Sequence, residues 1–175
     1  MSKITGEREL RQAMQKLQRD VKKQAVKSIR KIAKSAMKGA TKAVAKQIGV
    51  NAKTVRGRAR LTVSPKVNAP RAVIRVNRSQ MPLIRVLETN RNRISARKGV
   101  LKVGQHSVQR GFVQRLSNGR THIMFRQGRK RYGIDVARIP LATPLTNAFH
   151  QALADYPEQL KQELSKNLSL SFRRT

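Results

Sequence analysis

The sequence contains neither cysteine nor tryptophan, and its aromatic content is only 3%. Without cysteine, the chain can form no disulfide framework and no thiolate metal site. The scarcity of aromatic rings argues against a protein that stacks single-stranded bases on an aromatic platform. No apolar run approaches the roughly 18 residues that a membrane span needs, and the polar start MSKITGEREL does not resemble a signal peptide. We therefore expect a protein made and assembled in a cytoplasm, without a membrane partner.

Acidic residues are also scarce, with eight Asp and Glu against 40 Lys and Arg, which gives a formal net charge of +32. Residues 21–87 contain no acid at all and hold eighteen Lys and Arg. Repulsion at this density opposes a compact state, so a folded chain calls for counter-charge from a partner. By charge alone, nucleic acid, an acidic protein surface and an anionic membrane are the classes of partner that fit.

The N-terminal part of the 175-residue chain, residues 6–48, predicts one long helix or two in tandem. Apolar residues recur every three or four positions and form one stripe, which is bulky up to Ile32 and mostly alanine afterwards. Small side chains let another backbone approach closely, so we expect the alanine-lined half, residues 33–44, to pack against a neighbouring copy. Gly39 marks the place where the helix could break.

Residues 61–139 predict a β-rich core with hairpins. The strongest turn signal is Asn118-Gly119, for which a two-residue turn would pair Phe112 with Phe125 and place both on one face with Ile123. Residues 82–87 are expected to form a strand. Residues 89–99 combine turn formers and basic residues without periodicity, so they are expected to form a mobile loop.

The C-terminal part, residues 143–170, predicts a helical segment that begins near Thr143 and Pro144 and kinks or restarts at Pro157. Helix, then sheet, then helix gives an α+β fold, and the length suits a single domain over residues 1–175. We expect a long N-terminal amphipathic helix, a small antiparallel sheet or sandwich, and a C-terminal helix.

Side chains that could carry chemistry are few. Glu88 and Asp135 are the only carboxylates in the sheet region, and each is better explained as an ion-pair partner than as a catalytic acid or base. The three histidines share no metal-ligand spacing, and no nucleophile, phosphate-loop or dinucleotide motif is present. The sequence therefore predicts no enzyme, no cofactor and no metal.

Basic residues carry the strongest functional signal, because a solvated face usually mixes both signs of charge. No helix-turn-helix, zinc finger or RNA-binding motif is recognisable, so any contact with nucleic acid is expected to involve the backbone without sequence preference. The candidate contacts to DNA or to an acidic partner lie on the long helix, after it and in a later turn: Lys27, Lys31, Lys34, Lys38, Arg56, Arg58, Arg60, Arg129, Lys130 and Arg131.

Three stretches resemble the minor tail protein Z family, the tail completion proteins of long-tailed bacteriophages and prophages. The first is VRGRARLTVSPKVNAPRAVIRVNRSQMPLIRV at residues 55–86. The second is the hairpin with Gly111-Phe112 and Asn118-Gly119-Arg120, and the third is RYGIDVARIPLATPLTNAF at residues 131–149. The resemblance covers roughly residues 10–155. The chain departs from the family at Gly133, where proline is usual, and in the shortness of its Arg/Gly-rich loop.

The resemblance implies a structural virion protein at the neck, the head-proximal end of a phage tail. Such a protein completes the tail, connects it to the head and helps to position the end of the packaged DNA. The implied partners are other tail and neck proteins, such as the tail terminator and the head-tail connector, and a homohexameric ring. It also implies assembly in the host cytoplasm and no enzyme activity. The alternative is a free, sequence-independent nucleic-acid-binding protein of ribosomal or nucleoid type.

Overall fold

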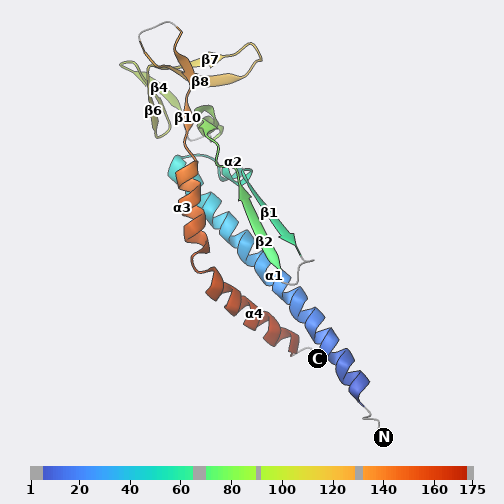
Figure 1. The fold of residues 1–175 in the computed structure, drawn as a ribbon. Helices are drawn as coiled ribbons and strands as arrows, with labels where there is room; N and C mark the ends of the chain where they lie inside the picture. Colours follow the sequence, from blue (N-terminus) through green and yellow to red (C-terminus); the bar gives the residue numbers. More distant parts are fainter. Residues whose placement is uncertain (1–5, 65–69, 90–91, 129–131, 173–175) are drawn as a thin grey trace. The chain divides into compact units, whose positions relative to one another are not determined.

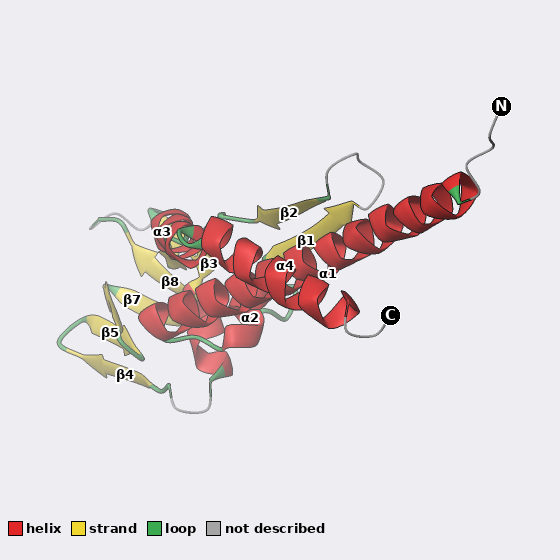
Figure 2. Cartoon of the chain, turned by 90° about the horizontal axis from the view of Figure 1, so that it is seen from below, coloured by secondary structure: helices red, strands yellow, loops and turns green. Residues whose placement is uncertain are grey.

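The computed structural model describes residues 6–64, 70–89, 92–128 and 132–172, without the side chains of 168 and 170–172. Figure 1 gives the order of the elements along the chain, and Figure 2 shows the helices and the short strands by colour. The fold is α+β, as predicted, with a long N-terminal helix, several small antiparallel sheets and two C-terminal helices.

The helices follow the predicted pattern. Helix α1 spans Glu7–Ile48 as one continuous helix, so Gly39 does not break it. Helix α2 covers Ala52–Arg56, and the side chain of Asn51 caps it by accepting a hydrogen bond from the Lys53 backbone NH at 2.9 Å. Helix α3 spans Ala142–Leu153, which begins slightly before the expected start. Helix α4 spans Tyr156–Phe172 and restarts around Pro157, as expected.

The strands form four small sheets. Strand β1 (Ala59–Ser64) pairs with β2 (Arg71–Val76), and β3 (Met81–Pro82) pairs with β10 (Arg138–Ile139). Strands β4 (Ile94–Arg97), β5 (Val100–Val103) and β6 (His106–Gln109) form one antiparallel sheet. Strands β7 (Gly111–Arg115), β8 (Thr121–Arg126) and β9 (Ile134–Val136) form another.

Two assignments of secondary structure were wrong. Residues 82–87, expected as a strand, belong mostly to the 3-10 helix η1 at Leu83–Glu88. The segment expected as an aperiodic loop contains strand β4, which is exposed along its whole length and therefore shows no alternation of apolar and polar residues. A two-residue turn at Lys98-Gly99 joins β4 to β5, and both residues have positive φ, 46° and 77°, as a hairpin turn of the mirror-image type requires.

The hairpin at Asn118-Gly119 forms, but its register differs by one residue from the prediction. Phe112 lies opposite Met124, and Val113 lies opposite Ile123. Leu116 and Arg120 close the turn with a hydrogen bond of 2.8 Å, so the loop has three residues, and Gly119 adopts a positive φ of 76° at its end. A shift of one residue exchanges the two faces of a strand, so the predicted face that joined Phe112, Ile123 and Phe125 was wrong.

The chain groups into two compact units. Unit 1 comprises residues 1–36, 61–74 and 153–175, and unit 2 comprises residues 37–60 and 75–152. The expectation of a single domain stays a prediction. Within unit 2 the most deeply buried side chains come from helices, strands and a loop: Val44, Val55, Met81, Val86, Val103, Ile123, Leu141 and Leu145.

Side chains from the β-rich part of unit 2 form hydrogen bonds with the backbone carbonyl groups at the C-terminal end of α1. Asn92 Nδ2 donates to the carbonyl oxygens of Gly49 and Val86, each at 2.8 Å. His106 Nε2 lies 2.8 Å from the Ile48 carbonyl oxygen, and Gln105 Nε2 donates to the Gln47 carbonyl oxygen at 2.6 Å. These side chains satisfy carbonyl groups that the last turn of a helix leaves without partners.

Within unit 1, α4 packs along α1 in the antiparallel direction. Glu163 pairs with Lys31 at 2.5 Å, and four residues later Asn167 donates to the hydroxyl of the fully buried Ser28 at 2.8 Å. As α4 advances, its contacts move back along α1. The hydrogen bond from Lys31 and its positive charge hold the pKa of the Glu163 carboxyl below its ordinary value.

This depressed pKa gives the α1–α4 contact a pH dependence. The folded protein stabilises ionised Glu163, so its contribution is complete above the ordinary glutamate pKa of about 4.3 and is lost as the pH falls through the lower folded value. We expect Glu163→Gln to reduce the loss of unfolding free energy between about pH 5 and pH 3, as followed by chemical denaturation. Lys31→Gln should reduce this loss in the same way. The double substitution should change the pH dependence of the unfolding free energy little more than either single substitution does. An unchanged pH profile in Glu163→Gln would show that the pair contributes nothing.

Candidate basic interface

Four of the candidate lysines lie on α1. Lys27, Lys31, Lys34 and Lys38 are all exposed, and their spacing of four, three and four residues places them on one face of the helix. Lys31 is engaged with Glu163, which gives it a structural role. Within the described ranges, the other three lysines form no ion pair. They are therefore the part of this series that is available to an external anion.

The three candidate arginines near α2 have different roles. Arg58 donates to the backbone oxygen of Ser79 at 2.7 Å and to its hydroxyl at 3.2 Å. Burial, together with the nearby charge of Arg85, lowers the pKa of the Arg58 guanidinium from its ordinary value. Arg58 thus joins two segments of unit 2, whereas Arg56 and Arg60 are exposed. The remaining candidates, residues 129–131, lie outside the described residues.

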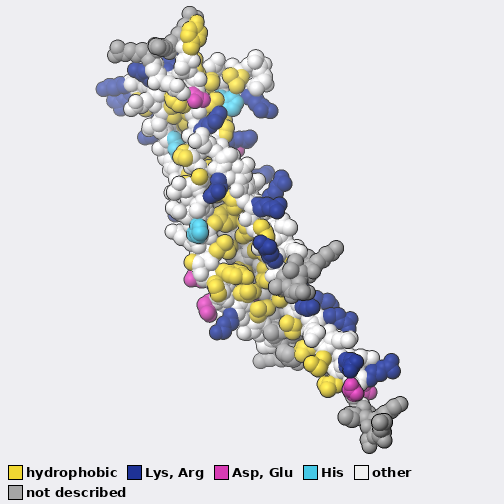
Figure 3. Space-filling model, viewed as in Figure 1, with side chains coloured by type: hydrophobic (Ala, Val, Ile, Leu, Met, Phe, Trp, Pro, Cys, Tyr) yellow, Lys and Arg dark blue, Asp and Glu magenta, His cyan; other side chains and the backbone are white. Residues whose placement is uncertain are grey.

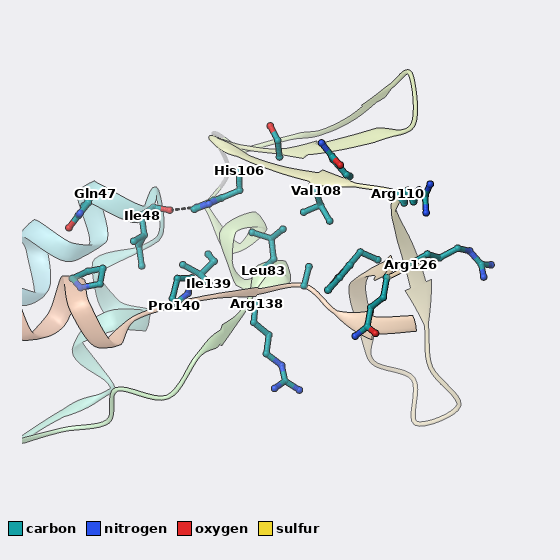
Figure 4. A pocket seen from close by; sticks show the side chains of 16 residues that line it. Gln47, Ile48, Leu83, His106, Val108, Arg110, Arg126, Arg138, Ile139 and Pro140 are labelled. Carbon is teal, nitrogen blue, oxygen red and sulfur yellow. Dashed lines mark hydrogen bonds between the residues drawn. The ribbon is translucent and has the colours of Figure 1, made fainter. Parts of the chain in front are cut away.

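A further group of arginines was missed in the sequence. A concavity of about 800 Å³ in unit 2 is lined by residues from the end of α1 and from the three strands β6, β8 and β10, including His106. In Figure 4, Arg110 and Arg126 extend at one end of this concavity, and Arg138 projects from the strand that crosses it. Arg126 also lies over the ring of Phe112, 5.5 Å from its centre, as in a cation–π contact. The Arg126 backbone NH donates to the Arg110 carbonyl oxygen at 3.3 Å, a contact between segments that the sequence analysis did not predict.

The two sheet-region carboxylates have structural partners. Glu88 accepts a hydrogen bond from the Thr54 hydroxyl at 3.1 Å and pairs with Arg85. Asp135 accepts from the Gln127 side chain at 3.3 Å and from the Val136 backbone NH at 2.8 Å. Glu88 therefore forms an ion pair, as the sequence predicted, whereas these contacts of Asp135 are hydrogen bonds from an amide and a backbone NH. In the part of the chain that the structure describes, no three His, Cys, Asp or Glu side chains come close enough together to hold a metal ion.

Taken together, the fold and these surfaces define a strongly basic α+β protein with exposed lysines and arginines on α1 and near α2. None of the helices formed by the described residues is long and apolar enough to cross a membrane. The chain belongs to the family described as prophage minor tail protein Z (GPZ), whose model matches residues 6–175. Membership in this family makes it a bacteriophage tail protein with a structural or assembly role.

Two curated relatives agree with this assignment. The chain is 40% identical over 140 residues to the tail completion protein of Escherichia phage N15, covering 76% of this chain and 75% of the relative. It is 37% identical over 166 residues to tail completion protein Z of Escherichia phage lambda, covering 85% of each chain. No solved structure matches the fold.

Proposed function

We propose that this protein completes the phage tail at its head-proximal end and connects the tail to the head. The observation that carries the proposal is the family match over residues 6–175, together with two relatives whose names describe tail completion. The direct neighbours would be tail and neck proteins, such as the tail terminator and the head-tail connector. In the virion the protein would occupy the head-proximal end of the tail, after assembly in the host cytoplasm.

The proposal includes a role for the basic surface in holding the end of the packaged DNA. The exposed lysines of α1 and the exposed Arg56 and Arg60 can neutralise phosphates without reading bases. The competing account is that these charges face acidic surfaces of neighbouring tail proteins. The family match favours a tail protein over the free nucleic-acid-binding protein considered from composition alone.

We also propose that the protein acts without catalysis. Glu88 and Asp135 are engaged by Arg85, Thr54, Gln127 and a backbone NH, as expected of carboxylates that hold a structure together. The homohexameric ring remains a prediction from the family resemblance. The expected packing of residues 33–44 against a neighbouring copy does not support the ring. Ala33, Ala36, Ala40 and Val44 are at most 7% exposed within a single chain. The alanine-lined face is used inside the chain and does not offer a surface to a neighbouring copy.

A phage whose gene for this protein carries an early stop codon tests the proposal. Tails of normal length are expected to form. They should either remain separate from DNA-filled heads or join them with the DNA end wrongly placed, and the infectious titre should fall by orders of magnitude. Supplying the intact chain in trans should restore the titre. Normal infectivity without the protein, or tails of altered length, would contradict the proposal.

A further inference from the structure

The N-terminal half of α1 carries an apolar stripe that its own chain leaves exposed. Leu10, Met14, Leu17 and Val21 are 63%, 56%, 46% and 37% exposed. Their spacing of four, three and four residues aligns them along one side of the helix. In Figure 3, hydrophobic side chains are visible at the surface among lysines and arginines toward the N-terminal end of the chain. This continuous row on a single helix is unlike isolated apolar residues on a surface.

The same side of α1 is covered farther along by α4. The contacts of Ser28 with Asn167 and of Lys31 with Glu163 mark where α4 lies on it. Beyond Asn167, α4 continues for only five residues, or about 7.5 Å, which reaches back to about residue 23 of α1. The stripe begins where α4 ends and extends for about 16 Å, the length of three helical turns. An antiparallel helix placed there would continue the line of α4.

Charge indicates what kind of helix would fit. Around the stripe, residues 7–23 carry six Lys and Arg against three acids, and two of those acids, Glu7 and Asp20, are engaged by Arg11 and Lys23. The α1–α4 contact shows the complementary arrangement, in which a carboxylate on the packed helix meets a lysine of α1. A second copy of the chain would bring the same excess of Lys and Arg over acids to the contact, so like charges oppose it.

We propose that the face of α1 formed by Leu10, Met14, Leu17 and Val21 docks an acidic amphipathic helix of another protein. Apolar side chains of that helix would cover the stripe, and its flanking carboxylates would meet Arg11 or Lys22. This is the helix-in-groove mode of recognition, in which anchors at helical spacing supply affinity and flanking charges select the partner. The proposal concerns this surface alone and does not depend on where in the tail the protein sits.

The absence of cysteine from the chain allows a site-specific test. Ala13→Cys places a single thiol beside the stripe for an environment-sensitive dye, and Gln12→Cys places one on the opposite side of the helix. The probe is a synthetic peptide of about three turns with leucines at helical spacing and glutamates on its flanks, compared with a scrambled peptide of the same composition. The ordered peptide should bind saturably and change the dye signal at position 13 only, and the scrambled peptide should bind at least about tenfold more weakly.

The double substitution Leu10→Gln and Leu17→Gln, made in the Ala13→Cys protein, should lower the affinity for the ordered peptide by at least about tenfold. The reason is that it removes two apolar anchors from exposed positions. Val113→Gln, which changes another exposed apolar residue to an amide, should leave binding unchanged, and circular dichroism should show the same helix content in each protein. Equal binding of the two peptides, no effect of the double substitution, or no binding of the ordered peptide would overturn the proposal. So would a dye signal at position 13 that changes with protein concentration alone, because the occupant would then be a second copy.

Discussion

Replacement of Lys27, Lys34 and Lys38 by glutamine is expected to lower the affinity for duplex DNA by about two to three orders of magnitude near 0.1 M salt. Each phosphate contact contributes about 0.9 to the slope of the logarithm of the binding constant against the logarithm of salt concentration. Three lost contacts should flatten this slope by about three units, equally for duplexes of different sequence. Lys31 is left intact because it holds Glu163. Fluorescence anisotropy over a series of salt concentrations measures both quantities.

Two matched controls separate this face from the overall charge. Lysine-to-arginine substitutions at the same three positions keep the charge and should keep the salt slope. Glutamine at Arg8, Arg11 and Lys22 removes three exposed charges that lie off this face of α1 and should have a much smaller effect. If both glutamine sets weaken binding alike, DNA responds to net charge and not to the lysine face. If neither set changes binding, this face does not contact DNA, and Arg56 and Arg60 become the candidates.

Leu145→Ala is expected to destabilise the protein by about 2 to 5 kcal/mol, the range for a fully buried leucine that leaves a cavity behind. Leu145 is 1% exposed on α3, and Leu141, one turn earlier, is fully buried. Small domains are typically stable by only about 5 to 15 kcal/mol, so the loss would be a large fraction of the total.

Urea denaturation at fixed salt concentration measures this effect, since salt screens the repulsion within so basic a chain. His150→Ala, at an exposed position of the same helix, is the control and should change the free energy of unfolding by less than about 0.5 kcal/mol. A loss below about 1 kcal/mol for Leu145→Ala would mean that α3 is not anchored through this side chain.

The sequence was most informative where one face of an element is buried over a long distance. The apolar spacing of α1 predicted a helix that the structure shows to be continuous, and Asn51 and Pro157 marked real boundaries. Strand β4 could not be recognised, because none of its residues is buried and alternation has no physical cause there. The register of the β7–β8 hairpin depended on whether the loop has two or three residues, and Asn118-Gly119 is compatible with both.

The candidate interface was predictable only in part for a similar reason. Spacing along a helix predicts which lysines share a face, as for Lys27, Lys34 and Lys38. Spacing does not predict which of these lysines make contacts within the chain. Lys31 finds its partner 132 residues away, and Arg58 finds its partner 21 residues away, so both contacts depend on tertiary structure. The exposed stripe from Leu10 to Val21 was visible in the sequence as an apolar face, but its exposure follows from where α4 ends.

The central claim is that this chain occupies the head-proximal end of the phage tail, and a cryo-EM reconstruction of the neck and tail of intact virions tests it most directly. The account predicts density for this chain, recognisable by the long α1 with α4 packed antiparallel along it, between the last ring of the tail tube and the head. Density for the chain at the host-facing tip, or virions that contain no copy of it, would contradict the account.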